Sequence, residues 1–174
     1  MDKALRYTDI QLALREVPDE ISLAASISGC PHRCPGCHSP WLQSPSGRAL
    51  TLEACLEEID RSPWATCFLL MGGDQSWEAI ESLAKGIKEA RPGIKIGWYS
   101  GGWPIELQED GTFIYNVDPE AFDYIKCGPY MASRGALDCP LTNQRMYKIE
   151  ASDDPEKGWI KLTDITSKFW THQP

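Results

Sequence analysis

The sequence lacks three features that would each point to a class of protein. No apolar run approaches the roughly 18 residues of a transmembrane helix, and the first seven residues, MDKALRY, contain no apolar segment typical of a secretory signal. There is no basic excess either, since 25 acidic residues oppose 17 Lys and Arg for a net charge of −8. We therefore expect neither a membrane protein, nor a secreted protein, nor a protein that binds the nucleic-acid backbone.

The cysteine content also argues against a disulfide framework. Seven cysteines are present, an odd number, and without a secretory signal they favour the reducing cytoplasm. No internal repeat, low-complexity tract or linker divides the 174 residues. We expect a cytoplasmic protein with a single domain over residues 1–174.

The most informative feature that is present is a tight cluster of cysteines. Cys30, Cys34 and Cys37 fall within eight residues, with the spacing C-x3-C-x2-C. Thiolates are soft ligands that suit iron–sulfur clusters or zinc. Three local thiolates with no obvious fourth would leave one metal position open to a substrate. A zinc site completed by His32 or His38 is the alternative interpretation.

The other cysteines do not complete an obvious site. A zinc ribbon needs a second ligand pair downstream, but Cys127 and Cys139 are 12 positions apart and form no C-x2-C pair. Cys55 falls on a predicted helix and Cys67 in a predicted buried strand. We expect both of these to be inert core cysteines.

Apolar strands alternate with amphipathic helices through the first hundred residues, which predicts right-handed crossovers and a parallel sheet. We count about five parallel strands, too few for a closed eight-stranded barrel. Thr51 and Ser76 are suitable N-caps for the two helices. The predicted strands are 10–14, 21–28, 66–71, 94–99, 122–126, 144–149 and 158–162, the predicted helices are 52–61 and 77–90, and a hairpin is predicted over 105–116.

Polar and glycine-rich segments follow the predicted strands. In parallel α/β folds, functional groups gather at the C-terminal ends of the strands. The cysteine loop follows the first parallel strand, Gly72-Gly73-Asp74 the second and Ser100-Gly101-Gly102 the third, while Thr142-Asn143-Gln144 leads into the fifth. A turn of two glycines can aim carbonyls at an ammonium group with help from Asp74. Taken alone, each turn is better explained as a tight connection between a strand and the next segment.

The cysteine loop followed by the Gly-Gly-Asp turn resembles the radical S-adenosylmethionine superfamily. The finer resemblance is to the small activating enzymes of anaerobic (class III) ribonucleotide reductases, and it covers nearly the whole chain. Two departures occur: Gln75 stands where the family often has Pro, and 104–116 does not match cleanly. The segments that carry the resemblance are 28–38, 72–74, 98–101, 122–130, 142–145 and 164–170.

The resemblance implies a [4Fe-4S] cluster held by Cys30, Cys34 and Cys37, whose open iron binds the amino and carboxylate groups of S-adenosyl-L-methionine. One electron would cleave the sulfonium C–S bond, and the resulting 5′-deoxyadenosyl radical would take hydrogen from a glycine of the anaerobic ribonucleotide reductase large subunit. A small electron donor such as a flavodoxin or ferredoxin is implied. The implied fold is a partial, open parallel (β/α) barrel of about five or six strands, whose missing wall admits the glycine loop.

Six further residues receive cosubstrate-binding roles from their positions in the resemblance. No general base is required, because the cosubstrate supplies the reactive species and the protein supplies orientation and exclusion of water. The methionine amine is assigned to Gly72, Gly73 and Asp74, the carboxylate or ribose to Ser100 and Asn143, and the adenine to His38.

Three alternatives stay open. The chain resembles, less closely, activases of other glycyl-radical enzymes such as pyruvate formate-lyase, which are usually longer. Small-molecule radical S-adenosylmethionine enzymes are a second alternative, although these often have a longer gap between their first two cysteines. A non-catalytic zinc or electron-transfer module is the third.

Overall fold

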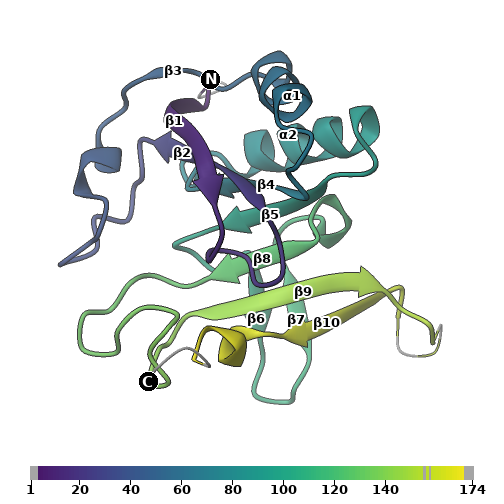
Figure 1. Ribbon diagram of the computed structural model, residues 1–174. Coiled ribbons are helices and arrows are strands. Elements are labelled where there is room, and N and C mark those ends of the chain that lie inside the picture. Colours follow the sequence, from purple (N-terminus) through teal and green to yellow (C-terminus); the bar gives the residue numbers. More distant parts are fainter. Residues whose placement is uncertain (1–3, 155, 157, 171–174) are drawn as a thin grey trace.

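The computed structural model describes residues 4–154, 156 and 158–170, and it arranges most of their strands in one open sheet (Figure 1). A separate two-stranded hairpin stands beside the sheet. The predicted hairpin and every predicted strand have a counterpart in the structure. The strands are β1 (Arg6–Ala13), β2 (Ser22–Ser28), β3 (Arg48–Ala49), β4 (Cys67–Met71), β5 (Lys95–Tyr99), β6 (Ile105–Leu107), β7 (Phe113–Tyr115), β8 (Tyr124–Cys127), β9 (Arg145–Ala151) and β10 (Ile160–Asp164).

The sheet is mixed, with the order β10-β9-β8-β5-β4-β2-β1-β3. Strands β2, β4, β5 and β8 are parallel, while β1 pairs antiparallel with β2, β9 with β8, and β10 with β9. The prediction of a fifth parallel strand is therefore wrong, because β9 runs antiparallel to β8. The connection from β8 to β9 contains no crossover helix and stays at one end of the sheet, so β9 returns in the opposite direction. Closure into a partial barrel remains a prediction.

Two helices cover one face of this sheet (Figure 1). Helix α1 spans Leu52–Arg61 and helix α2 spans Trp77–Ala90, which confirms both predicted ranges. Thr51 caps α1 by accepting a hydrogen bond from the Ala54 N–H at 3.2 Å, and Ser76 caps α2 in the same manner. Local hydrogen bonding at the helix starts thus explains where both helices begin.

Both faces of the central strands are buried. In β4, Phe68 and Leu70 pack toward the helices, while Cys67 and Leu69 face a smaller second core. This alternation follows the two-residue period of a strand. Since both faces are covered, β4 is apolar throughout.

The cysteines outside the loop are mostly structural. Cys55, Cys67 and Cys127 are fully buried, and burial raises the pKa of each thiol to about 12. This confirms Cys55 and Cys67 as core residues and places Cys127 inside β8, where it cannot form a surface zinc pair with Cys139. Inert packing is the role that burial assigns to all three.

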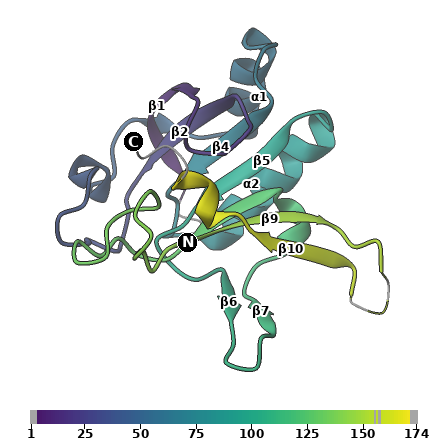
Figure 2. The same ribbon diagram turned by 60° about the horizontal axis from the view of Figure 1, so that its bottom comes forward.

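The cysteine loop, the segment that follows it and the loop between β8 and β9 lie at one end of the sheet, and the tip of the β9–β10 hairpin extends from the other (Figure 2). The C-terminal segment packs as predicted, with Ile165 and Thr166 buried. In the described part of the chain, no helix is long and apolar enough to cross a membrane. The prediction that the N-terminal segment is not a secretory signal concerns residues 1–7. Residues 1–3 of that segment lie outside the described part of the chain. The short 3-10 helices are η1 (Pro40–Gln43), η2 (Pro119–Ala121) and η4 (Thr166–Phe169).

Candidate functional site

The cysteine loop begins where β2 ends, and three hydrogen bonds hold its start. The backbone N–H groups of Gly29 and Cys30 both donate to the Leu42 carbonyl, at 2.7 and 3.0 Å. The side-chain Nε2 of Gln75 donates to the Ser28 carbonyl at 2.9 Å. The loop is thus anchored both by the returning chain at η1 and by the β4–α2 turn.

The rest of the loop turns tightly. Arg33 and Gly36 have positive φ angles of 46° and 73°, and the Cys37 N–H donates to the Cys34 carbonyl at 3.1 Å. The Ser39 N–H donates to the Cys37 sulfur at 3.3 Å. The backbone of the turn thus holds the Cys37 sulfur in place.

The three thiols lie on the loop as a group. Cys30, Cys34 and Cys37 are each half-buried and free of disulfides. Burial raises the pKa of Cys30, and the charges of Asp74, Cys34 and Cys37 raise it further. A bound metal centre would offset this effect on Cys30 by placing positive charge next to its sulfur.

The three thiols are the donors that a [4Fe-4S] cluster uses, and the histidines of the loop have contacts of their own. Among the residues that the structure describes, no three His, Cys, Asp or Glu side chains converge on one metal ion. A four-iron cluster has no such requirement, because each cysteine binds a different iron. His32 Nε2 lies 3.3 Å from Asp74 Oδ2, and the His38 ring packs against Tyr130 with centroids 4.8 Å apart. Both candidate zinc ligands therefore have contacts of their own.

Asp74 connects two turns at this end of the sheet. They are the Gly72-Gly73-Asp74 turn after β4, called the second loop, and the Ser100-Gly101-Gly102 turn after β5, called the third loop. Its side chain is only 2% exposed. Oδ1 accepts hydrogen bonds from Trp77 Nε1 at 3.0 Å and from the Ser100 hydroxyl, and Oδ2 accepts the Gly101 N–H at 2.9 Å. With the His32 contact, this one carboxylate links the cysteine loop to the ends of β4 and β5.

The glycines of the third loop make this interlocking possible. A β-carbon on Gly101 would lie 2.6 Å from His32 Cδ2, and one on Gly102 would lie 2.7 Å from Trp77 Cζ2. The His32 ring can approach the third loop only because no side chain is there. The two loops consequently behave as one packed unit.

The Gly72-Gly73 turn has a clear structural cause. Both φ angles are positive, at 102° and 90°, and added β-carbons would lie 2.9 Å from the Ile27 carbonyl oxygen and 2.3 Å from Ile80 Cδ1. The Gly72 carbonyl accepts a hydrogen bond from Trp98 Nε1 at 2.8 Å. These contacts account for both glycines, and a contact with the methionine amine stays a prediction.

Ser100 and Asn143 differ in what they leave available. The fully buried Ser100 hydroxyl donates to Asp74 and accepts the Gly102 N–H at 2.9 Å, so its one proton is already used. Asn143 Nδ2 donates to the Pro129 carbonyl at 3.1 Å, while its Oδ1 is buried and has no partner among the described residues. Their cosubstrate roles stay predictions, and Asn143 is the residue with a free acceptor.

Two more polar atoms near the loop lack hydrogen bonds within the part of the chain that the structure describes. They are Gln75 Oε1 and His32 Nε2, whose contact with Asp74 is not aligned as a hydrogen bond. Buried polar atoms are normally paired, because leaving them unpaired costs free energy. Unpaired atoms beside three thiols fit a polar ligand bound there.

Lys126 is a site residue that the sequence reasoning missed. It is 8% exposed, and its Nζ donates to the carbonyls of Ser100 and Gly128 at 3.2 and 2.8 Å. Burial lowers the pKa of Lys126 to about 8, against the opposing effect of Asp74 and the neighbouring thiols. A lysine at the end of an apolar strand was the available signal. It supplies a positive charge beside the cysteine loop.

Comparison with known proteins places this site in a family. Residues 21–121, more than half of the chain, match the family model described as a 4Fe-4S single cluster domain. The matched segment holds the cysteine loop, the Gly-Gly-Asp turn and the third loop. No curated protein and no solved structure gives a significant match. The chain belongs to the family of 4Fe-4S single cluster domains, of the radical S-adenosylmethionine type.

Proposed function

We propose that the chain is a glycyl-radical activase that acts on anaerobic ribonucleotide reductase. The observation that carries the proposal is the cysteine loop at the end of β2. Its three thiols are half-buried and lie beside buried polar atoms that have no hydrogen-bond partner among the described residues. The choice of reductase rests on the sequence resemblance, which continues past the matched family segment through 122–130 and 142–145.

The protein's own residues have defined tasks in this proposal. Cys30, Cys34 and Cys37 hold the cluster, which supplies the electron for reductive cleavage of S-adenosyl-L-methionine when both are bound. Asn143 Oδ1 offers an acceptor to the cosubstrate. The buried Lys126 ammonium offsets the negative charge of Asp74 and of the neighbouring cysteine sulfurs. Asp74 holds the second and third loops in register. None of these side chains needs to act as a general base.

Exposed apolar side chains near the loop favour a protein substrate over a small molecule. Trp41, in η1, is 62% exposed, and Met131 is 42% exposed. Met131 belongs to the segment that touches the loop, where a β-carbon on Gly36 would lie 3.6 Å from the Tyr130 ring. Exposed apolar groups around a reactive centre are typical of surfaces that bind another protein.

The decisive experiment is an anaerobic activation assay. The reconstituted chain, S-adenosyl-L-methionine and dithionite are mixed with the cognate anaerobic ribonucleotide reductase, and EPR and 5′-deoxyadenosine are measured. We expect a glycyl doublet on the reductase and about four irons per activase chain.

The alternatives give different outcomes in the same assay. A doublet on pyruvate formate-lyase but not on the reductase would assign the chain to that partner. Formation of 5′-deoxyadenosine with no protein radical would favour a small-molecule substrate. A colourless chain with one tightly bound zinc would contradict radical chemistry altogether.

A further inference from the structure

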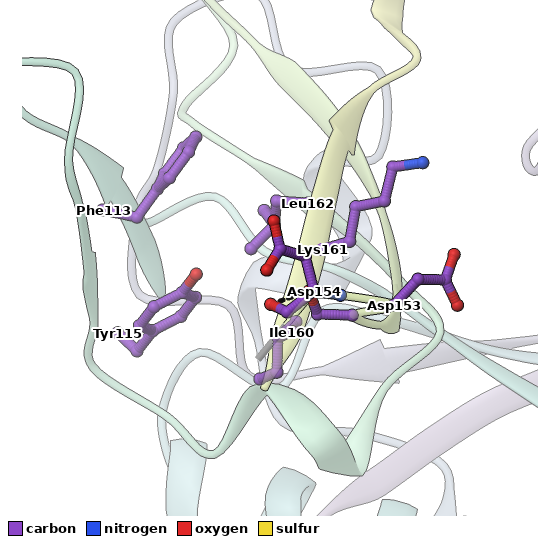
Figure 3. A pocket seen from close by; sticks show the side chains of 8 residues that line it. Phe113, Tyr115, Asp153, Asp154, Ile160, Lys161 and Leu162 are labelled. Carbon is purple, nitrogen blue, oxygen red and sulfur yellow. Dashed lines mark hydrogen bonds between the residues drawn. The ribbon is translucent and has the colours of Figure 1, made fainter. Parts of the chain in front are cut away.

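A pocket lies between two hairpins at the end of the sheet opposite the cysteine loop. The β6–β7 hairpin supplies Phe113 and Tyr115, and the β9–β10 hairpin supplies the opposite wall, around a space of about 540 Å³. Figure 3 shows the two aromatic rings on one side of a gap, facing Ile160, Leu162 and Asp154 on the other. The pocket is outside the radical site and has no role in the function proposed above.

The pocket has an apolar floor and an aromatic wall. Ile160 and Leu162 are half-buried and pack against the main core. Phe113 is fixed edge-on against Tyr147, with ring centroids 5.6 Å apart, whereas Tyr115 is 41% exposed. The Tyr115 ring therefore presents an accessible face, held in place by the strand pairing of Ile105 with Tyr115.

Acidic residues lie on one side of this apolar space. Asp153 and Asp154 are among its lining residues, and in Figure 3 the Asp153 carboxylate and the Lys161 ammonium both point away from the aromatic rings. Residues 105–115 and 150–161 together contain seven carboxylates and two lysines, so these two segments carry −5 of the chain's net charge of −8. A cation at this surface meets both a negative field and a ring face.

A wider apolar rim continues beyond the pocket. Leu107, paired with Phe113 and therefore on the same face of the hairpin, is 59% exposed. A small cation would not cover Leu107, whereas a polypeptide segment would.

We propose that this two-hairpin pocket docks an arginine side chain on an apolar, basic segment of a partner protein. The guanidinium stacks on Tyr115 near the Asp154 carboxylate, and the aliphatic part of the side chain lies on Ile160 and Leu162. A neighbouring apolar residue of the partner covers Leu107. Two copies of this acidic chain repel each other, so the charge favours a different protein as the occupant.

The test uses the full chain, loaded with its cluster and labelled with ¹⁵N for NMR. The probe is a blocked pentapeptide, Gly-Leu-Arg-Leu-Gly, and its matched control replaces arginine by citrulline, which has the same shape without the charge. We expect the arginine peptide to shift the amide signals of 113–115 and 159–162. We expect the citrulline peptide to bind about tenfold more weakly.

Two variants locate the interaction. Tyr115→Ser removes the exposed ring, and we expect about tenfold weaker binding of the arginine peptide; Asp154→Asn should weaken binding about threefold. Asp138→Asn makes the same charge change in an exposed loop at the other end of the sheet and should leave binding unchanged.

Three outcomes would overturn the proposal. Equal shifts with both peptides would mean that the pocket does not recognise the cation. Shifts confined to residues outside the two hairpins would place the site elsewhere. Shifts that appear on raising the protein concentration without peptide would identify a second copy of the chain as the occupant. Activation of the reductase is measured separately, so failure here does not bear on the radical chemistry.

Discussion

The two ends of the four parallel strands carry polar groups of contrasting character. At the N-terminal end, the buried Glu20 carboxylate accepts hydrogen bonds from Thr66 and Tyr124, both at 2.7 Å, and from Lys95. At the C-terminal end, Asp74 is equally buried, yet several polar atoms around it lack partners among the described residues. The Glu20 carboxylate is supplied with three donors and supports the fold, although Ser22 Oγ at the same end has no partner among the described residues. The unpartnered atoms at the other end lie beside the cysteine loop, where a ligand can bind them.

The pKa shifts follow the same contrast. Burial alone would raise the pKa of Glu20, but hydrogen bonds from Lys95, Thr66 and Tyr124 outweigh burial and lower it. At the other end, burial lowers the pKa of Lys126 to about 8 in spite of Asp74. One end therefore stabilises its buried charge, and the other holds a charge at a net cost in stability.

The largest effect is expected from removing one of the proposed cluster ligands at the C-terminal end of the parallel strands. Cys34→Ser should reduce the iron content of the reconstituted chain from about four per chain to near zero, because one of only three thiolates is lost. Iron analysis and the visible absorbance measure this. Cys139→Ser, which removes another half-exposed thiol, is the matched control and should keep the full iron content. Full iron in Cys34→Ser would contradict the ligand assignment.

At the N-terminal end of the parallel strands, we expect removal of the Glu20 carboxylate to lower stability without affecting the cluster. Glu20→Ala leaves three donors without their acceptor and should lower the free energy of unfolding by about 2–3 kcal/mol at neutral pH. Because the folded-state pKa of Glu20 is lowered, its contribution is present above the ordinary carboxyl pKa and is lost as the pH falls. Urea unfolding should therefore show the difference from wild type shrinking below about pH 4. A difference that grows on acidification would contradict this network.

A substitution of the other buried carboxylate sharpens the comparison. Asp74→Asn places an amide donor against existing donors and should cost about 1–2 kcal/mol in stability. Unlike Glu20→Ala, it should also weaken binding of S-adenosyl-L-methionine about tenfold, measured by anaerobic equilibrium dialysis. If both variants bound the cosubstrate equally well, the proposed difference in function between the two ends would be wrong.

The smallest effect is expected at the anchor of the cysteine loop. Gln75→Met keeps the side-chain length but removes the hydrogen bond to the Ser28 carbonyl, and it should cost about 1 kcal/mol. The loosened loop should also lose iron faster to a chelator. Gln11→Met, on the exposed side of β1, is the control and should change neither quantity. Unchanged iron loss in Gln75→Met would show that the loop does not depend on this anchor.

Much of the fold could be predicted, because the deciding interactions are local. Thr51 and Ser76 cap the two helices through hydrogen bonds within one turn, and the spacing of the three cysteines is visible in the sequence itself. The direction of β9 could not be predicted, because an apolar strand pattern is the same in either direction. It depends on the path of the preceding loop.

The site was predictable only where a residue type carries its chemistry alone. Lys126 was missed because a lysine in an apolar strand can equally place its charge in solvent, and only tertiary packing buries it. The contact of Gln75 with the start of the loop depends on packing between segments far apart in the sequence. The same is true of the pocket between the two hairpins.

The position of β2 within the sheet has a consequence for the order of assembly. The strand is hydrogen-bonded on both sides, to β1 and to β4, while the cysteines lie beyond its end in a loop. A cluster can therefore be inserted or lost without breaking a single rung of the sheet. We expect amide hydrogen exchange to be slow in 22–28 and unchanged by the metal, and to slow in 30–39 once the cluster is present.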